Sequence, residues 1–585
     1  MLVIPRSVER QRMDHYPGSA RSLERRLRER RGTDITATER GGSIVLEGEM
    51  AAWMLKIEAG WTAARYPYRN VVNDIQVPGI KEDRLDPVAG RDGALAGRYY
   101  DVAIIGGGVV GAAIARELSR WDVSVVLLEK ENDVAVHTSS RNDGMIHDGF
   151  AARPGTKKAH YNVRGNRLWE PLCRELGIEF KRPGSLMLFS TPLEVAAYPL
   201  LADRARRNGV DGWEYWSRAR VFAEEPNVAM DQHGGFFLPS AGVLSPYKAT
   251  IALVESAILN GANIELGTWV TGMELESGSI ARVVTNRGTM RAGVVVNAAG
   301  NWADVIAGMA GDRFFSLHQR RGTDVILDAT TAPLQHHIMG RPSLSQARTR
   351  TKGGGLVMTV EGNILVGPTA HEMPGREDYE TRAEELEELT KHVRLNTRLS
   401  MAQAITYFSG VRPCTYDEDF IIERSQRVSN LVHAAGIQSP GLASAPAIAQ
   451  DIAAMALERV ATFKAVRPRT GWLADRPAAP EPKRMSAERR SELIAQRPAY
   501  GRIVCRCEEI SEGEVIDAAT AVLPATNMDA VKRRTRAGMG RCHGGFCTPR
   551  VMEILARETG GPLWSVTKKG PGSELGVGPT KGPRP

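Results

Sequence analysis

The sequence predicts a multidomain α/β protein. We expect a Rossmann-type dinucleotide-binding domain joined to a mixed-sheet substrate domain, a small α+β domain before it and a small helical domain after it. At 585 residues, the chain is too long for one domain, and its 42% hydrophobic and 25% charged residues are typical of a globular protein. A glycine-rich turn between two apolar strands begins the central region, and four of the six cysteines form two pairs near the C-terminus.

The first predicted domain covers residues 18–82. Its apolar spacing predicts a helix over 19–31, a strand over 43–48, a helix over 51–64 and a strand over 71–77. This order, with Gly-Ser-Ile-Val-Leu-Glu-Gly and Asn-Val-Val-Asn-Asp-Ile, resembles a BON domain. The resemblance implies association with a membrane or another binding surface. A small packing module without a ligand is the alternative.

Arginines are frequent in this N-terminal region, although the formal charge of the whole chain is a modest +8. No nucleic-acid motif accompanies them, so we expect a solvated helix face and no nucleic-acid partner, with contact to anionic lipid or an acidic partner as the alternative. The residues are Arg21, Arg25, Arg26, Arg28, Arg30 and Arg31. Without a long apolar run or an apolar leader, the sequence predicts a cytoplasmic protein, with peripheral attachment to the inner face of the membrane as an alternative.

The central domain begins with a dinucleotide fingerprint. An apolar strand over 101–105 leads into Gly106, Gly108 and Gly111 in G-x-G-x-x-G, and a helix and a second strand follow and end at Glu129. The glycines let the backbone approach a pyrophosphate, and the acid binds a ribose hydroxyl. A glycine-rich structural turn is the alternative, and the fingerprint alone does not separate NAD from FAD.

The paired cysteines are candidate metal ligands. Cys505 and Cys507 are in C-x-C, whereas Cys542 and Cys547 are in C-x4-C. A zinc knuckle usually has C-x2-C, which both spacings fit poorly, so iron-sulfur ligation is the better match. A zinc site, a pair of disulfides and unconnected buried thiols are the alternatives.

The last domain, residues 501–560, follows a proline-rich and charged linker over 467–502. Ile-Val-Cys-Arg-Cys-Glu-Glu and Lys-Arg-Arg-Thr-Arg-Ala-Gly-Met-Gly-Arg-Cys resemble the bacterioferritin-associated-ferredoxin type of 2Fe-2S domain. The resemblance implies a 2Fe-2S cluster bound by Cys505, Cys507, Cys542 and Cys547.

Residues 99–465 resemble the D-amino-acid-oxidase superfamily of FAD-dependent oxidoreductases. Five segments carry the resemblance in order: 138–149, 295–304, 362–370, 408–413 and 436–442. With the cluster domain attached, the chain resembles the large subunit of anaerobic glycerol-3-phosphate dehydrogenase and its relatives. The resemblance implies FAD rather than NAD.

The resemblance also implies site residues. The predicted cofactor-binding residues beyond the fingerprint are Thr138, Ser139, Ser140, Asn142, Ala299, Gly300, Gly436, Gly441 and Leu442. His147 matches the family histidine beside the flavin and can accept the substrate hydroxyl proton; a histidine that only orients its loop is the alternative. Arg412 matches the family Gly-x-Arg-Pro and can bind a carboxylate or phosphate; a structural ion pair is the alternative.

One departure concerns the substrate. The aerobic glycerol-3-phosphate enzymes carry Gly-Gly-Lys-Leu-Thr where this chain has Gly-Ile-Gln-Ser-Pro-Gly-Leu over 436–442, so the lysine that helps hold the phosphate is missing. Glutamine has no charge, so phosphate recognition is weakened unless Arg141, Arg321 or another cation substitutes. The substrate tail can then be a carboxylate.

The sequence thus predicts a dehydrogenase of a small anionic secondary alcohol that passes electrons through the cluster to a redox partner protein or a quinone-linked acceptor. Glycerol 3-phosphate is the first substrate we expect, an L-2-hydroxy acid the second and an amino acid the third. A non-catalytic electron-transfer subunit is the rival class.

Overall fold

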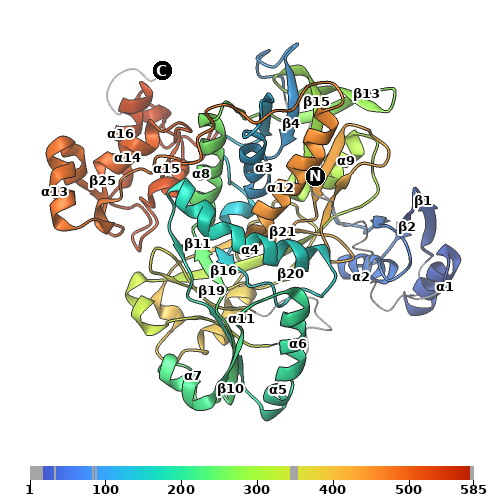
Figure 1. Ribbon diagram of the computed structural model, residues 1–585, viewed down its shortest axis with the longest axis horizontal. Coiled ribbons are helices and arrows are strands. Elements are labelled where there is room, and N and C mark those ends of the chain that lie inside the picture. Colours follow the sequence, from blue (N-terminus) through green and yellow to red (C-terminus); the bar gives the residue numbers. More distant parts are fainter. Residues whose placement is uncertain are drawn as a thin grey trace.

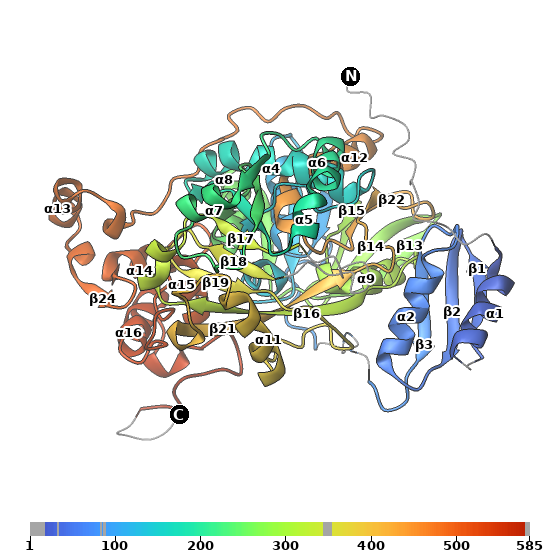
Figure 2. The ribbon, with the colours of Figure 1, turned by 90° about the horizontal axis from the view of Figure 1, so that it is seen from below.

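The computed structural model describes residues 18–31, 34–81, 83, 85, 89–342 and 354–579. A large central body carries one small module at each end, the N-terminal module on one side and the C-terminal module on the other (Figures 1 and 2). This confirms the predicted mixed α/β body with a small helical C-terminal domain. Among the described helices, none is both long and apolar enough to cross a membrane.

The first sheet of the body has a parallel centre. Its neighbouring parallel strands are β12 (Asn263–Leu266), β5 (Val125–Glu129), β4 (Tyr99–Ile105), β15 (Gly288–Asn297) and β23 (Leu431–Ala435). The central strands are almost wholly buried apolar runs because helices cover one face and further strands and loops cover the other. The helices of the covered face are α3 (Val109–Leu118), α4 (Lys157–Leu176), α8 (Pro246–Leu259) and α12 (Gly441–Val460).

Antiparallel strands extend this sheet. They are β13 (Val270–Glu276) and β14 (Ser279–Thr285), which follow β15, and β22 (Ile421–Arg424), which pairs with β23. The carboxyl ends of the parallel strands meet at one edge, where ligands of such sheets bind.

The second sheet is mixed and lies beside the first (Figure 2). Its strand order is β20 (His371–Met373), β16 (His318–Leu327), β19 (Ile364–Gly367), β18 (Gly355–Met358), β17 (Ile338–Gly340), β8 (Ser185–Phe189), β10 (Gly234–Leu238) and β9 (Glu214–Ser217). The long strand β21 (Ala404–Cys414) pairs with β16, and every residue of β16 is buried. A separate three-stranded antiparallel sheet has the order β6 (Met145–Ile146), β11 (Gly242–Leu244) and β7 (Phe180–Lys181).

The N-terminal module has one strand more than predicted. Its elements are α1 (Ala20–Arg31), β1 (Thr36–Arg40), β2 (Ser43–Glu49), α2 (Trp53–Ala63) and β3 (Val71–Gln76). The predicted order of helix, strand, helix, strand is wrong because β1 pairs antiparallel with β2. Only Ala37 of β1 is buried, so its apolar pattern is weak, but the Gly41-Gly42 turn that joins the strands is a hairpin signal.

This module packs firmly on the body. The ring of Tyr416 lies so close to α2 that a Cβ added to Gly60 would stand 2.2 Å from the Tyr416 Cε1 atom. Asn73 donates from Nδ2 to the Tyr416 hydroxyl at 3.0 Å, and Arg69 pairs with Glu423. The module is therefore held in place by contacts on several of its elements.

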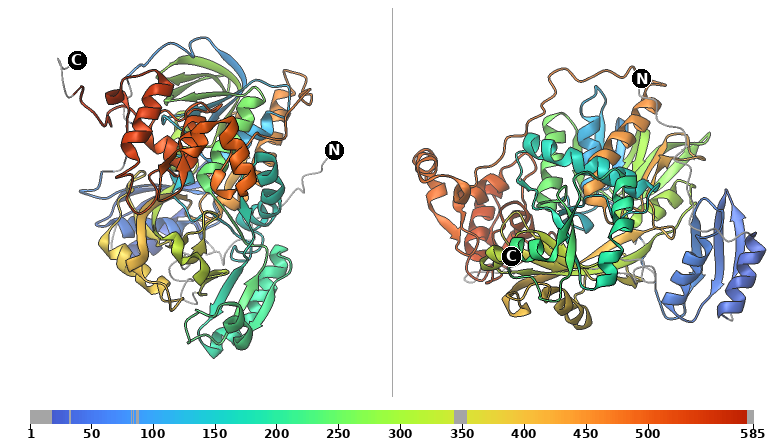
Figure 3. Two further views of the ribbon diagram at one scale, coloured as in Figure 1. Left: turned by 90° about the vertical axis from the view of Figure 1, so that its left-hand side faces the viewer. Right: turned by 60° about the horizontal axis from the view of Figure 1, so that its bottom comes forward.

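The C-terminal module is a small helical bundle with its own apolar core. Its elements are α13 (Ala487–Gln496), β24 (Ile503–Cys505), β25 (Ile510–Ser511), α14 (Glu512–Ala519), α15 (Met528–Thr535) and α16 (Thr548–Thr559). The connection before it runs along the body rather than free in solvent (Figure 3), because Trp472 donates to Ser119 Oγ at 3.3 Å and Arg476 pairs with Glu255 at 2.6 Å.

Candidate functional site

The glycine turn after β4 allows very close backbone contacts. Gly106 has a φ of +112°, and a Cβ there would stand 2.4 Å from the Ala298 carbonyl oxygen. At Gly111, a Cβ would stand 2.0 Å from the Gly106 carbonyl oxygen. Gly108 is the N-cap of α3, so the turn delivers the chain to a helix N-terminus. Residues larger than glycine would open the turn that the fingerprint predicts as a pyrophosphate cradle.

Glu129, the last residue of β5, is buried at the same edge. Its carboxylate accepts the Gly107 N–H at 2.6 Å and the Glu131 N–H at 2.9 Å. Burial raises the pKa of Glu129. The side chain is therefore fixed beside the glycine turn, where its remaining lone pairs can accept a hydroxyl donor.

A cavity of about 840 Å³, including its open mouth, lies at this edge. The predicted cofactor-binding residues that line it are Gly106, Gly108, Glu129, Thr138, Ser139, Ala299 and Gly300. Lining side chains that the sequence analysis did not single out are Lys130, His137, Trp269, Trp302, Glu377 and Tyr379. The glycine turn, the helix N-terminus and the buried acid fit a dinucleotide such as FAD.

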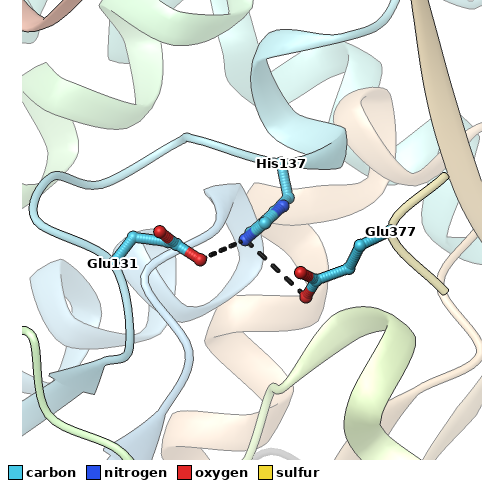
Figure 4. A group of neighbouring side chains, drawn as sticks. All are labelled: Glu131, His137 and Glu377. Atoms are coloured by element: carbon cyan, nitrogen blue, oxygen red, sulfur yellow. Dashed lines mark hydrogen bonds and ion pairs between the residues drawn. The ribbon is translucent and has the colours of Figure 1, made fainter. Parts of the chain in front are cut away.

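Three lining side chains form a group with metal-ligand chemistry: Glu131, His137 and Glu377 (Figure 4). His137 Nε2 lies 2.8 Å from Glu131 Oε1 and 3.9 Å from Glu377 Oε1. The Lys130 ammonium already bridges both carboxylates, 2.8 Å from Glu377 Oε1. His137 and Lys130 together hold the pKa of Glu131 at about 2 against the effect of burial. The group is an ion network in the cavity wall.

Glu377 and Tyr379 belong to the charged run over 376–394, whose composition predicts a solvated helix. That prediction is wrong for residues 376–382, because the helix α11 (Ala383–Val393) begins only at Ala383. The residues before it run to the cavity instead. The signal for this was the aromatic Tyr379 inside an otherwise charged run.

Hydrogen bonds fix the segment 138–142, both within itself and to neighbouring parts of the body. Thr138 donates from Oγ1 to the Val411 carbonyl at 2.7 Å, and Ser139 Oγ accepts the N–H of Val109 at 2.9 Å. Asn142 donates from Nδ2 to the Thr138 carbonyl at 2.9 Å, so its amide fastens the loop. Neither Ser140 nor Asn142 lines the cavity.

His147 lies against the loop before α12. Its Nε2 is 3.5 Å from the Ser439 hydroxyl, and Asn166 donates to its backbone carbonyl at 3.0 Å. The imidazole is half-buried. Gly436 and Gly441 begin and end this loop, and the Leu442 carbonyl accepts from Trp169 at 2.9 Å. The four predicted site residues His147, Gly436, Gly441 and Leu442 do not line the dinucleotide cavity, so they form a separate part of the site.

Arg412 stands on β21 directly opposite Arg320 of β16. Opposed residues of antiparallel strands share a face, so both side chains point from the same side of the sheet. The half-buried Arg412 donates from Nη1 and Nη2 to the Thr369 carbonyl at 3.3 and 3.4 Å. No carboxylate of the described chain lies within 4.0 Å of its guanidinium. The structural ion pair that was the alternative for Arg412 is therefore not seen among these residues.

The two neighbouring arginines are already neutralised. Arg321, on the opposite face of β16, pairs with Asp378 at 2.9 Å and Glu385 at 2.8 Å, so it does not replace the missing lysine. Arg320 pairs with Glu418 at 2.7 Å.

Gln438 joins the Arg320 network. Its Oε1 accepts from Arg320 at 3.4 Å, and its Nε2 donates to Glu418 at 2.7 Å. His147 contacts Ser439 in the same loop. The loop thus links the surroundings of His147 to the sheet face that carries Arg412.

The four C-terminal cysteines converge. Cys507 Sγ is 3.7 Å from Cys542 Sγ, and Cys505 is hydrogen-bonded to Cys547, which lowers the pKa of Cys505. No disulfide joins any of the six cysteines. Backbone N–H groups of Gly538 and Glu508 point at Cys505, and those of Phe546 and Gly544 point at Cys542. Four sulfurs with amide donors fit the thiolates of an iron-sulfur cluster.

The cluster module contacts the body next to the segment 133–137, which leads into the cavity wall. The buried Asp133 accepts from Arg533 at 2.7 Å and from Arg534 at 2.9 Å. Arg536 donates to Asn363 at 2.9 Å in the body and pairs with Glu508 at 2.7 Å within the module. Asp133 lies four residues before His137 of the cavity wall. The two cofactor regions therefore share one short segment of chain.

Comparisons with known proteins agree with this geometry. The family model of FAD-dependent oxidoreductases matches residues 101–455, and that of BFD-like [2Fe-2S] binding domains matches residues 503–557. The chain is 39% identical to a glycerol 3-phosphate dehydrogenase of Caloramator mitchellensis, over 82% of this chain and 99% of that protein. It is 26% identical to the anaerobic glycerol-3-phosphate dehydrogenase subunit A1 of Haloferax volcanii, over 78% and 83%.

Among solved structures, the chain is similar to the dithionite-reduced L-alpha-glycerophosphate oxidase of Mycoplasma pneumoniae with FAD bound. The TM-score is 0.60 at 27% identity, covering 65% of this chain and 98% of that one. The predictions of FAD and of a 2Fe-2S cluster are thereby confirmed. The chain belongs to the FAD-dependent oxidoreductase family and carries a BFD-like 2Fe-2S-binding domain.

Proposed function

We propose that the protein oxidises glycerol 3-phosphate with FAD and releases the electrons through the 2Fe-2S cluster. The observation that carries the proposal is Arg412, a half-buried guanidinium with only a carbonyl partner and no carboxylate within the described residues. A partly buried guanidinium without a directly paired carboxylate favours an anionic ligand. The Asp324 carboxyl acts on Arg412 only from beyond ion-pair distance, and burial raises the pKa of Asp324 well above its ordinary value, which favours the neutral acid. The names of the relatives supply the alcohol, because they include glycerol 3-phosphate dehydrogenases and oxidases.

The proposed chemistry assigns roles to two side chains. Bound FAD supplies the acceptor for a hydride. Arg412 binds the anionic end of the substrate, and Nε2 of His147 accepts the hydroxyl proton as the C–H bond breaks and a carbonyl forms. The Asn166 bond to the His147 backbone and the contact with Ser439 hold the imidazole in position. Two electrons and two protons leave each substrate molecule.

The chain residues around each cofactor are proposed from the same geometry. The fingerprint glycines, Glu129, the pair Thr138 and Ser139 and the segment 299–300 hold the dinucleotide. Asn142 fastens the 138–142 segment, and the loop 436–442 closes the side next to His147. The four converging cysteines hold the cluster.

An L-2-hydroxy acid is the second candidate substrate. Gln438 carries no charge and is bonded to the Glu418 carboxylate at 2.7 Å, so this position adds no cation for a phosphate dianion. Arg412 alone would match a carboxylate. An L-2-hydroxyglutarate dehydrogenase of Escherichia coli is 29% identical over 48% of this chain and 67% of that protein.

Anaerobic rapid mixing tests the proposal. The holoprotein is mixed with glycerol 3-phosphate, with L-2-hydroxyglutarate and with L-proline, and flavin absorbance is followed. We expect glycerol 3-phosphate to bleach the flavin fastest. A faster response to L-2-hydroxyglutarate would select the second candidate, and no response to any substrate would favour a non-catalytic electron-transfer subunit.

The BON-like character of the N-terminal module and its attachment to the inner face of the membrane are also proposals. The exposed face of α1 carries Arg21, Arg25 and Arg28, whose charges can meet anionic lipid. Arg25 and Arg28 would exchange their exposed partners Glu29 and Asp34 for lipid phosphates. Co-sedimentation with phosphatidylserine vesicles, compared with neutral vesicles, tests this. Equal sedimentation with both would leave the module as a packing unit.

A further inference from the structure

The four cluster cysteines differ in their exposure to solvent. Cys507 is exposed and Cys542 half-buried, whereas Cys505 and Cys547 are buried in the module core. The module forms one end of the molecule (Figure 3), and α15 holds it to the body by delivering Arg533 and Arg534 to Asp133. Cys507 therefore stays exposed while the module is docked on the body.

The exposed aromatic ring of Phe546 lies in the loop that carries two of the cluster ligands. The Phe546 side chain is 85% exposed, although the residue directly precedes the buried Cys547 and its N–H points at Cys542. Ile503, two residues before Cys505, is also 54% exposed. Large exposed rings that a fixed loop holds in place are typical anchors of protein interfaces.

The charges around the ring are mainly positive. Arg506 is exposed between two cluster ligands, and no carboxylate of the described chain lies within 4.0 Å of it. Arg541 directly precedes Cys542 and is 67% exposed, though it bridges to Asp328. The Glu508 carboxylate turns inward to Arg536, which leaves Glu509 as the exposed acid of the ligand loop. A surface with this balance repels basic proteins and attracts acidic ones.

We propose that this exit face, defined by Ile503, Arg506, Cys507, Arg541 and Phe546, docks an acidic one-electron carrier protein. The inference rests on the proposed function, which sends electrons out through the cluster. Phe546 provides a central apolar contact, and the arginines steer the encounter and set the salt dependence. A small interface of this kind suits a transient electron-transfer complex. The acceptor is therefore a protein with an acidic surface around its redox centre.

Binding tests the docking without turnover. The oxidised holoprotein is titrated by calorimetry with cytochrome b5, an acidic haem protein, and with cytochrome c, a basic one, at ionic strengths of about 0.01 M and about 0.1 M. We expect cytochrome b5 to bind more tightly and to lose affinity as salt rises. Phe546→Ala and Arg506→Glu should each weaken it at least about tenfold, or about 1.4 kcal/mol. Phe546→Leu, which keeps an apolar side chain, should retain most of the affinity.

Two matched controls test the surface itself. Phe463→Ala removes a ring that is 46% exposed on the body, and Arg282→Glu reverses a charge on β14. Both should leave cytochrome b5 binding unchanged. Cluster absorbance checks that every variant is loaded.

Electron transfer from dithionite-reduced holoprotein gives the second readout. Each docking event passes one electron to a ferric haem, so haem reduction should slow in Phe546→Ala and Arg506→Glu as their affinity falls. Equal binding of both cytochromes, or full affinity in both variants, overturns the docking proposal. Because dithionite replaces the substrate, failure of glycerol 3-phosphate to bleach the flavin would overturn the proposed function and leave this result standing.

Discussion

Three arginines on one pair of strands show how partners decide the role of a residue. Arg320 and Arg321 of β16 each pair with two acidic groups. Within the part of the chain that the structure describes, Arg412 of β21 donates to the Thr369 carbonyl and pairs with no carboxylate. Gly322 leaves the room that the Arg412 guanidinium occupies, since a Cβ there would stand 2.4 Å from Nη2 of Arg412. The guanidinium keeps donors that the proposed function assigns to a substrate anion.

Arg412→Lys should lower kcat/KM at least about tenfold, which corresponds to about 1.4 kcal/mol of transition-state binding. An ammonium cannot reproduce the planar pair of donors. Steady-state kinetics together with the flavin absorbance of the purified variant measure this, and FAD content should not change. Arg282→Lys, at an exposed position of β14, is the matched control. An unchanged kcat/KM would return Arg412 to a structural role.

His147→Asn should slow flavin reduction roughly a hundredfold, because general-base catalysis contributes at least that much. Substrate affinity should change less, since the proton moves only in the transition state. Rapid mixing across a pH series separates the two effects. His160→Asn, an exposed histidine on α4, is the control. If the variant keeps the rate and the pH profile, His147 only orients its loop.

Among individual residues, the sequence could predict those whose chemistry depends on a local motif. Gly106, Glu129 and the four cysteines belong to this class, because short spacing forces their placement. Glu377 and Tyr379 could not be found in this way. They reach the cavity from a distant segment, the one that follows β20, and the pairing of β20 with β16 brings that segment there.

Among the elements, α15 carries the main ionic contact between the cluster module and the body. Burial alone would raise the pKa of Asp133, but Arg534 and Arg533 outweigh it and hold the pKa below its ordinary value. A carboxyl group with a lowered folded pKa stabilises the folded state above its unfolded pKa of about 4. That contribution is lost as the pH falls through the folded value.

Asp133→Asn should therefore destabilise the docking of α15 by about 3 kcal/mol between pH 5 and 8, since it leaves buried guanidinium groups without their counter-ion. Native-state hydrogen exchange of the α15 amides measures the free energy of opening. The difference from wild type should shrink below about pH 4. Asp328→Asn, which breaks the exposed pair with Arg541, should cost about 1 kcal/mol or less. Equal effects of the two changes would contradict the prediction.

Elements with strong apolar periodicity could be predicted, and those with weak periodicity could not. The apolar runs of β4 and β5 and the helix α3 lie where the sequence places them. The strand β1 was missed because only one of its five residues is buried. The charged run before α11 was misassigned because charge alone does not show that a segment turns toward a cavity.

For the molecule as a whole, the arrangement of cofactors predicts a separation of the two half-reactions. Replacing Cys505 and Cys507 with serine should leave substrate-driven flavin bleaching largely intact and abolish electron transfer to a one-electron carrier. Iron and sulfide analysis and rapid mixing measure this. Cys173→Ala, in the core of the body, should keep the cluster. Carrier reduction at the wild-type rate without a cluster would contradict it.

The two modules lie at opposite ends of the body, and each is pinned to it by several side chains (Figures 1 and 2). Because the modules lie at opposite ends, the point of attachment to an electrode sets how far the cluster lies from its surface. A molecule immobilised through the N-terminal module should turn its cluster away from the support, whereas one attached by its C-terminal module should bring the cluster against it. Voltammetry on an electrode should therefore give direct current in the second orientation, while the first should need a diffusing mediator.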